Sequence, residues 1–400
     1  MILVKQLQNF ALYLYFFFVN FQELSFFGLN NFSIPKFTIL IYLGTIAIQH
    51  RDYIRISNLK KIMAPLLAFF GLLIIVNLFN INNLSARFFD FAIFQNIILF
   101  WILINHGRKD IKAFEKALLI LALGSVLLAV FYNAGIGVEY EEVYGVTRAT
   151  LFGDNSNITS IRMVISILII ITAVFQDRLR IGLYRFLLLI PIIIMINLMA
   201  ETGSRVGFIS LALAFIVGIL FYKAKNNWNK IFVIIAGSLS FSLFLTFILK
   251  SEMLVLRLLK TVVDNDLAGR DEVWVEIINI VQNNLIFGIG QTGYFSIFGI
   301  ASPHNVFLEV LIYTGIIGLF LYLIFILRIS IYAYKLLKTK RIILPVLLMS
   351  PIFGVLLSGQ ILTMKLGWIV IAYTVSLYLN EFSVSLLKNN KSNLNIGVEK

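Results

Sequence analysis

The chain has 400 residues, of which 60% are apolar and 13% charged, and its mean hydropathy is +0.93. A soluble domain has roughly 45–50% apolar and about 25% charged residues, so the composition excludes a soluble protein and predicts an integral membrane protein. In a soluble protein a net charge of +13 would suggest nucleic-acid binding. In a membrane protein the same charge is explained by Lys and Arg residues in the loops between spans, so no nucleic-acid partner is expected. The chain has no cysteine, which excludes disulfides and thiolate metal sites.

Apolar stretches along the chain predict the fold class. A hydrocarbon core about 30 Å thick takes roughly 20 apolar residues per spanning helix. The sequence therefore predicts an all-α, polytopic membrane protein with twelve spans, forming a single membrane domain over residues 1–400. In chain order the predicted spans are 7–27, 34–49, 62–80, 88–105, 115–135, 158–175, 186–201, 205–222, 231–249, 304–327, 342–359 and 365–380.

The distribution of Lys and Arg predicts the orientation. If the N-terminus is cytoplasmic, the five inward loops carry 19 of the 33 Lys and Arg residues. Such a bias is typical of cytoplasmic loops, so both termini are predicted inside, with 381–400 as a cytoplasmic tail that is polar and disordered over 389–400. His50 and His106 are expected to be surface residues of inward loops. The inward loops are 50–61, 106–116, 176–185, 223–230 and 328–341.

Two outward segments, 136–157 and 250–303, are too long to be simple turns and are expected to carry the function. The second is the larger outward loop and contains an amphipathic pattern over Asp271–Leu285. This pattern predicts a helix that lies on the membrane face or folds back over the bundle. Its predicted apolar face consists of Val273, Trp274, Ile277, Ile278 and Val281.

The first candidate site residue is Arg205, in the segment ETGSRVGF. Gly203 is expected to end one span and Ser204 to cap the next, which leaves Arg205 in its first turn. An arginine pushed into lipid is costly, so it must face water, a cavity or an anion. It either contacts lipid phosphate or Glu201, or binds a phosphate group of a substrate bidentately.

The second candidate is Arg270, which opens the amphipathic helix after Gly269. Asp264, Asp266 and Asp271 stand nearby. Acidic residues at a helix N-terminus complement its dipole, and that is the simpler interpretation. A site for Mg²⁺ or Ca²⁺ remains the alternative for these three acids.

The third candidate is His304, at the outer end of the tenth predicted span and beside Asn305. Ser302 is expected to cap this helix, with Pro303 in its first turn. A histidine can accept a proton from a hydroxyl group near neutral pH. A capping or interfacial role is the alternative.

The fourth candidate is Arg148, in the segment TRATLFGDNSN at 147–157. It is an outward cation followed by a Gly-Asp-Asn turn, and as a turn the segment needs no function. As a site it offers a cation and amides for sugar hydroxyls. Aromatic residues suited to carbohydrate lie in the same outward segments, namely Tyr140, Tyr144 and Tyr294.

Together these residues predict a cationic site with one neutral base at the outer ends of different helices. Such a site suits a substrate made of lipid, diphosphate and sugar. The arginines would hold the diphosphate and the histidine would deprotonate an acceptor hydroxyl. Because a diphosphate is a good leaving group once its charge is screened, neither a metal nor a cofactor is expected.

Three motifs in chain order resemble those of the O-antigen ligase and polymerase superfamily. His304-Asn305, nine residues, Gly315, two residues and Gly318 resemble its H-N-x9-G-x2-G signature. The GR-x3-W motif at 269–274 with GIG at 288–290, and the SR at 204–205, resemble two further marks. The segment 147–157 is similar to a looser stretch that often precedes a middle span. The resemblance covers about the C-terminal two-thirds of the chain.

The resemblance implies a bacterial inner-membrane glycosyltransferase with a periplasmic active site, an inverting reaction and no metal. Arg205 and Arg270 would stabilise the diphosphate, and His304 would act as the acceptor base. Arg148, Asn305 and Tyr294 are candidate substrate-binding residues. The implied partners are an undecaprenyl-diphosphate-linked glycan donor, a glycan or lipid A–core acceptor, membrane lipids, a chain-length regulator and a flippase.

Two activities of this superfamily differ in their acceptor. A polymerase transfers the growing chain to a lipid-linked repeat unit, and a ligase transfers the finished chain to lipid A–core. The short separation of Arg270 and His304 favours the polymerase, since a ligase must admit a bulky core. A transporter of lipid-linked sugar is a further alternative, but it would place ionisable residues near the bilayer midplane.

Overall fold

The computed structural model describes residues 2–24, 33–54, 59–79, 91–143, 146–176, 187–221, 249–263, 270–299, 303–358 and 362–395, together with 242, 245 and 246. The predicted ninth span, 231–249, falls largely outside these residues. So do Tyr144, Asp264, Asp266 and Ser302.

Almost all of the described chain is helical, and each predicted span other than the ninth overlaps a helix. By length and composition α4, α6, α7 and α14 can each cross a membrane, and α2, α8, α9 and α15 are shorter apolar helices. The chain is thus an all-α, polytopic membrane protein, while the number of twelve spans stays a prediction. The helices are α1 (Ile2–Phe18), α2 (Ile34–Ala47), α3 (His50–Tyr53), α4 (Lys60–Phe79), α5 (Phe91–Lys109), α6 (Ile111–Asn133), α7 (Ser156–Gln176), α8 (Ile190–Glu201), α9 (Arg205–Phe221), α11 (Glu252–Val263), α12 (Arg270–Asn283), α13 (Gly290–Phe298), α14 (Val306–Lys340), α15 (Leu344–Ser358) and α16 (Lys365–Asn395).

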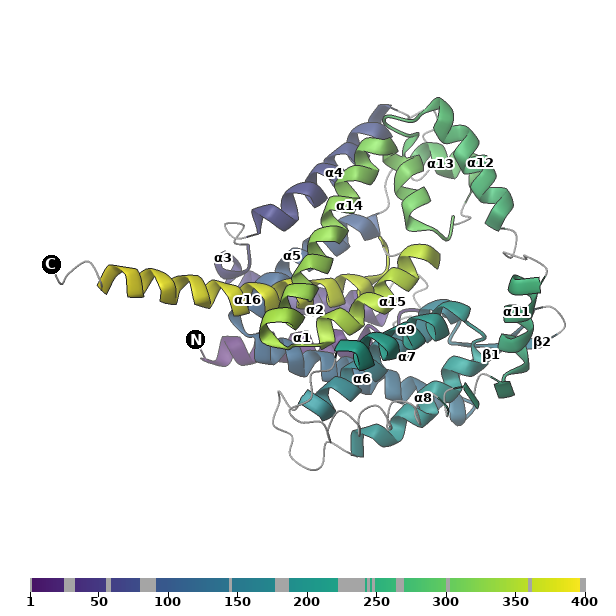
Figure 1. Cartoon of the computed structure of the whole chain (residues 1–400), viewed down its shortest axis with the longest axis horizontal. Helices are drawn as coiled ribbons and strands as arrows, with labels where there is room; N and C mark the ends of the chain where they lie inside the picture. Colours follow the sequence, from purple (N-terminus) through teal and green to yellow (C-terminus); the bar gives the residue numbers. More distant parts are fainter. Residues whose placement is uncertain are drawn as a thin grey trace.

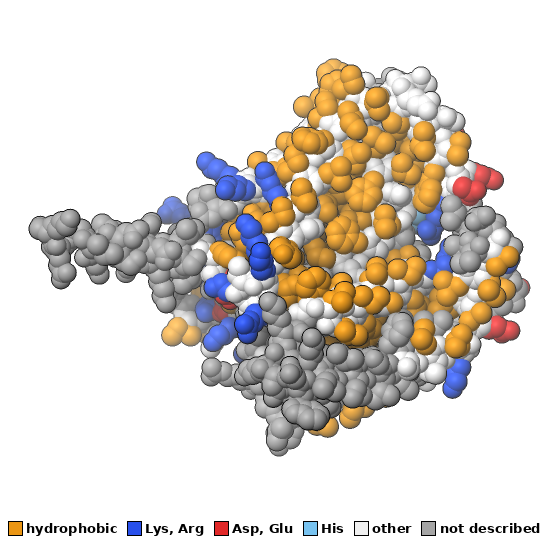
Figure 2. All heavy atoms as spheres, viewed as in Figure 1, with side chains coloured by type: hydrophobic (Ala, Val, Ile, Leu, Met, Phe, Trp, Pro, Cys, Tyr) orange, Lys and Arg blue, Asp and Glu red, His pale blue; other side chains and the backbone are white. Residues whose placement is uncertain are grey.

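The start of α1 and the end of α16 lie at the same end of the bundle, on the left in Figure 1, and α11 lies at the opposite end. Helices α12 and α13 form the upper right part of the same view. Figure 2 shows hydrophobic side chains over the middle of the molecule and many Lys and Arg side chains near the end that holds the termini. This arrangement agrees with two termini on one side; that this side is cytoplasmic stays a prediction.

Two predicted boundaries are wrong because helices continue past them. The predicted inward loop 328–341 is helical, since α14 extends to Lys340 and ends at Arg341, whose φ of 56° is left-handed. The expected tail is helical as far as Asn395. Both segments are polar enough to end a membrane span, but polarity does not end a helix that continues beyond the bilayer.

The prediction that His106 is a surface residue is also wrong, because its side chain is only 1% exposed. Helix α5 continues to Lys109 and places the imidazole against α1 and α2. There Nδ1 lies 3.0 Å from the hydroxyl of Tyr42, and Nε2 lies 3.0 Å from Oδ1 of Asn9. An imidazole with both nitrogens bonded can be buried at little cost. His50 is exposed, as predicted.

The segment 136–157 contains a β-hairpin that the sequence did not predict. Strands β1 (Val138–Val143) and β2 (Val146–Leu151) are antiparallel, with Arg148 opposite Glu141. At the base of the hairpin the amide of Phe152 donates to the carbonyl of Gly137 at 2.7 Å. The Phe152 ring packs edge-on against Phe131 of α6, with ring centroids 6.0 Å apart. The hairpin therefore holds Arg148 at the end of the bundle away from the termini.

Helix α14 is broken at Gly315, where φ is 62° and ψ is −164°. The chain between α12 and α13 bonds to the backbone on both sides of the break. The amide of Ile289 donates to the carbonyl of Ile312, and the amide of Ile316 donates to the carbonyl of Leu285, both at 2.8 Å. The GIG and H-N-x9-G-x2-G motifs are therefore joined through their backbones.

Substituting Gly315 with alanine is expected to destabilise the protein. A Cβ at Gly315 would clash with the carbonyl group of Ile286, and its positive φ disfavours any side chain. We expect Gly315→Ala to lower the free energy of unfolding by about 2 kcal/mol or more, measured by thermal unfolding in detergent. Gly71→Ala in α4 is the matched control, since nothing lies within 4 Å of the added Cβ. Equal melting temperatures for the two variants would contradict this account of the break.

Candidate functional site

The end of α8 binds the guanidinium groups of two arginines from other elements. Nε of Arg148, on β2, donates to the carbonyl of Thr202 at 2.7 Å, and Nη1 of Arg257, on α11, donates to the carbonyl of Gly203 at 2.9 Å. The last carbonyls of a helix have no partner within the helix and carry partial negative charge. Two cations therefore satisfy two adjacent carbonyls in the turn that leads to α9.

Arg205 is the first residue of α9 and lies beside this pair. Its Nη1 is 3.5 Å from the carbonyl oxygen of Arg257, while Arg257 binds the carbonyl of Gly203 on the same turn as Arg205. Gly203 has a φ of 58°, and a Cβ there would lie 2.5 Å from Cγ of Met253. The turn thus needs glycine, and α11 packs directly against it.

Asn157 connects the hairpin to the start of α9. Its Oδ1 accepts from Nη2 of Arg148 at 3.3 Å and from Oγ of Ser204 at 2.9 Å. The amide of Gly207 donates to Oγ of Ser204 at 3.5 Å, which agrees with the predicted cap. The last residue of the TRATLFGDNSN segment therefore holds both Arg148 and the SR motif.

The structure brings Arg148, Arg205 and Arg270 into one electrostatic environment. Burial lowers the pKa of Arg148, Glu141 opposite it raises the pKa, and Arg205 and Arg270 lower it. Burial and the charge of Arg205 also lower the pKa of Arg270. Arg148 and Arg270 thus each feel the positive charge of another arginine, an arrangement that favours binding of an anion.

Helix α12 begins at Arg270 and confirms the predicted amphipathic helix, with slightly earlier bounds. Ile277 and Val281 are buried, and the helix packs on α14. Ile278, also on the predicted apolar face, is 46% exposed. The packed face follows Ile277 and Val281, four residues apart, and turns Ile278 away.

Trp274, one turn after Arg270, fixes the chain that leads to His304. Its indole Nε1 donates to the carbonyl of Pro303 at 2.7 Å. The next residue, His304, is half-buried and has a φ of 51°, which costs energy in a residue with a side chain. The tryptophan of the GR-x3-W motif thus holds the strained turn that presents the histidine.

Asn305, not Ser302, is the N-cap of α14. Its Oδ1 accepts from the amides of Phe307 at 3.0 Å and Leu308 at 3.3 Å. The helix begins at Val306, so the prediction of Pro303 in its first turn is wrong. His304 lies just outside the helix because the stronger cap stands one residue after it.

The tyrosines expected to bind sugar lie in different environments. Tyr140 on β1 is 65% exposed. Tyr294 on α13 is fully buried, stacked on Phe298 at 4.8 Å and edge-on to Tyr313 at 5.5 Å. The structure therefore places Tyr294 in an aromatic cluster, and its sugar-binding role stays a prediction. Of the three acids considered for a metal, Asp271 is exposed in the first turn of α12.

Arg257 was missed by the sequence analysis. It is 7% exposed and lies in the apolar run of α11. The sequence signal that could have identified it is a single arginine within the apolar run MLVLRLL of an outward segment. An arginine side chain is costly to bury unless its hydrogen-bond donors are satisfied. The partner that satisfies it, the carbonyl of Gly203, is a backbone group that no sequence motif marks.

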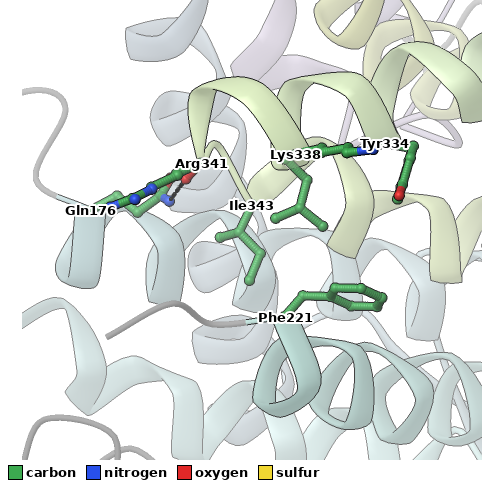
Figure 3. A pocket seen from close by; sticks show the side chains of 7 residues that line it. Gln176, Phe221, Tyr334, Lys338, Arg341 and Ile343 are labelled. Atoms are coloured by element: carbon green, nitrogen blue, oxygen red, sulfur yellow. Dashed lines mark hydrogen bonds between the residues drawn. The ribbon is translucent and has the colours of Figure 1, made fainter. Parts of the chain in front are cut away.

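A cavity of about 290 Å³ lies elsewhere, at the C-terminal ends of α7, α9 and α14. Figure 3 shows Gln176 and Arg341 on one side of it and Lys338 beside Tyr334 on another. Since the arginine site is at the N-terminal end of α9 and the turn before α14, this cavity is separate from it. Its lining residues are Gln176, Phe221, Tyr334, Leu337, Lys338, Arg341 and Ile343.

Residues 190–323 match a family model described as O-antigen ligase. This segment of the chain is similar to the O-antigen ligase family. The matched segment runs from α8 into α14 and contains Arg205, Arg257, Arg270 and His304, so the predicted resemblance to the O-antigen ligase and polymerase superfamily is confirmed. Arg148 lies before the matched segment. No curated protein is significantly similar to the chain.

Proposed function

We propose that this O-antigen ligase-type protein is a polymerase that transfers an undecaprenyl-diphosphate-linked oligosaccharide onto a lipid-linked repeat unit. The reaction takes place at the periplasmic face of the bacterial inner membrane. A flippase would deliver the donor, and a chain-length regulator would limit the product. The polymer is an O-antigen or a related surface polysaccharide.

The observation that supports the proposal is a group of arginines, one of which, Arg270, opens the helix whose Trp274 bonds to the chain just before His304. Arg205 and Arg270 lower the pKa of Arg148, and Arg205 lowers the pKa of Arg270, so these positive charges influence one another. Arg270 forms no ion pair or hydrogen bond with another residue in the described part of the chain. A half-buried guanidinium in that position is suited to a phosphate group, which matches its planar geometry.

In the proposed reaction each of these groups has one role. His304 accepts the proton of an acceptor hydroxyl as the hydroxyl oxygen attacks the anomeric carbon. The bond from this carbon to the diphosphate oxygen breaks on the opposite face, which inverts the configuration. The leaving undecaprenyl diphosphate keeps the bonding electrons, and Arg205 and Arg270 stabilise its added charge.

The polymerase is favoured over the ligase by the compact segment between the arginine and the histidine. From Arg270 to the His304 turn the described chain forms α12 and α13, which pack on α14 and α4. The second candidate is the ligase itself, since the matching family model carries that description. The two activities use the same donor and differ in the acceptor hydroxyl.

Glycan gels of a deletion strain distinguish these two activities. For a polymerase we expect lipid A–core bearing one repeat unit and no long chains, because ligation still occurs. For a ligase we expect bare core, with long chains left on the lipid carrier. A wild-type ladder in the deletion strain would contradict both activities. Complementation with the intact gene is the control.

A further inference from the structure

The cavity of about 290 Å³ lies where three predicted membrane spans meet the same side of the bilayer. Gln176 follows the predicted span 158–175, Phe221 lies at the end of 205–222, and Ile343 lies at the start of 342–359. The end of α14 supplies the other lining residues, among them Tyr334, which is 51% exposed. Tyrosine is enriched at membrane–water interfaces. By these boundaries the cavity lies at the level of the lipid headgroups.

The end of α14 carries three cations, Lys338, Lys340 and Arg341, and two of them line the cavity. Nζ of Lys340, which does not line it, lies 3.6 Å from a carboxylate oxygen of Glu381 on α16. Lys338 and Arg341 are exposed and form no ion pair among the residues that the structure describes. Nζ of Lys338 lies 5.9 Å from the ring centroid of Tyr334, at the limit of a cation–π contact. Both charges can therefore bind an anion in the cavity.

Arg341 has a backbone conformation that is unusual for its residue type. It follows α14 with a φ of 56° and a ψ of 28°, the left-handed conformation in which many helices end at glycine. For a residue with a Cβ this conformation is strained. Nε2 of Gln176 donates to the carbonyl of Arg341 at 3.1 Å and holds the turn against α7 (Figure 3). A cation at a position that suits glycine indicates a use for its side chain.

The remainder of the cavity wall is largely apolar. Phe221 is 43% exposed at the end of α9, and in Figure 3 Ile343 and Phe221 lie below the two cations. Ligand pockets measure roughly 300–1,000 Å³, so this cavity is at the small end of the range. Cations next to apolar side chains in a small cavity match a phosphate group that is attached to apolar chains.

We propose that this cavity binds the headgroup of an anionic phospholipid from the leaflet predicted to be cytoplasmic. Lys338 and Arg341 bind the phosphate oxygens, and Phe221 contacts the beginning of an acyl chain. Basic pockets between membrane helices recognise such headgroups. A zwitterionic headgroup brings a cation of its own beside the two side chains and is disfavoured. The site is separate from Arg205 and His304, so it does not rest on the proposed function.

Binding of phosphatidylglycerol to the purified full-length protein in a non-ionic detergent tests this site. The Kd is measured by native mass spectrometry. The double variant Lys338→Gln/Arg341→Gly removes both charges and is expected to raise the Kd by about tenfold or more. Lys335→Gln is the matched control, because Lys335 is exposed one turn earlier on α14 and does not line the cavity. Its Kd should stay within about twofold of the wild type.

Arg341→Gly alone separates headgroup binding from a role in folding. Glycine adopts a φ of 56° without strain, so without lipid the melting temperature should equal or exceed that of the wild type. A ligand that binds only the folded state raises the melting temperature. Saturating phosphatidylglycerol should therefore raise the melting temperature of Arg341→Gly by less than that of the wild type.

Phosphatidylcholine and inorganic phosphate serve as the comparison ligands, and both should bind more weakly than phosphatidylglycerol. Equal binding of phosphatidylcholine, or a wild-type Kd for the double variant, would show that the cavity is not an anionic headgroup site. Inorganic phosphate that binds as tightly as the lipid would assign the cavity to a water-soluble phosphate compound instead. If Arg341→Gly does not fold, Lys338→Glu reverses one exposed charge, and an unchanged Kd for that variant overturns the proposal.

Discussion

His304→Ala is expected to abolish long-chain glycan while the protein still inserts in the membrane. The side chain lies in a turn outside α14, so its removal takes away the base without disturbing a helix. Without a group to accept the hydroxyl proton, the transfer rate should fall by about 10²–10⁴-fold. Glycan gels of a deletion strain that expresses the variant measure the effect, with membrane immunoblots to verify insertion.

His50→Ala is the matched control for this substitution. His50 is exposed on α3 and should be replaceable without effect on chain length. His106 is unsuitable as a control because it is buried and bonded at both nitrogens. Wild-type chain length in His304→Ala would remove the histidine from the mechanism, whatever the arginines do.

Arg205→Lys is expected to lose much of the activity even though the charge is kept. An ammonium group offers one point of contact, whereas the guanidinium can bind two phosphate oxygens in one plane. We expect a loss of about 10- to 100-fold in polymer formation, which corresponds to roughly 1.4–2.7 kcal/mol of transition-state stabilisation. The length distribution of the glycan and the total polymer per cell are the measurements.

Arg51→Lys provides the control for a change of cation. Arg51 is exposed on α3, in a loop predicted to face inward, and should tolerate lysine. Full activity of Arg205→Lys would mean that the guanidinium of the wild-type protein only anchors the chain at the lipid surface, a role that any cation could fill. Binding of undecaprenyl diphosphate to the same variant, measured in nanodiscs, shows whether the loss arises before the chemical step.

The helices could be predicted because a membrane span needs only a long apolar run. The predicted ranges 34–49 and 205–222 lie within two residues of the ends of α2 and α9. Where a helix leaves the bilayer, this rule no longer applies. Polar residues at 328–341 and at 381–395 could mark a loop or a helix in water, and only packing decides between them.

Contacts between distant side chains and backbone groups could not be predicted. The burial of His106 depends on Tyr42 and Asn9, which are not near it in sequence. The burial of Arg257 depends on its hydrogen bond to a backbone carbonyl, a kind of group that every residue has. In contrast, Arg205, Arg270 and His304 could be proposed as site residues because charged or titratable groups at helix ends are unusual in so apolar a chain. The hairpin around Arg148 was missed because its strands are short and mostly polar.

The break in α14 has a consequence for substrate range. Two backbone hydrogen bonds tie residues 285–289 to the helix on either side of Gly315, and the Trp274 indole ties α12 to the chain before His304. Breaking each such bond costs about 1 kcal/mol. Together these bonds therefore hold the spacing between Arg270 and His304 constant. Under the proposed function, acceptors of different bulk would be accommodated on the side of α8, α9 and α11, where no comparable backbone link to α12 occurs among the described residues. Enlarging the acceptor repertoire by engineering would begin there.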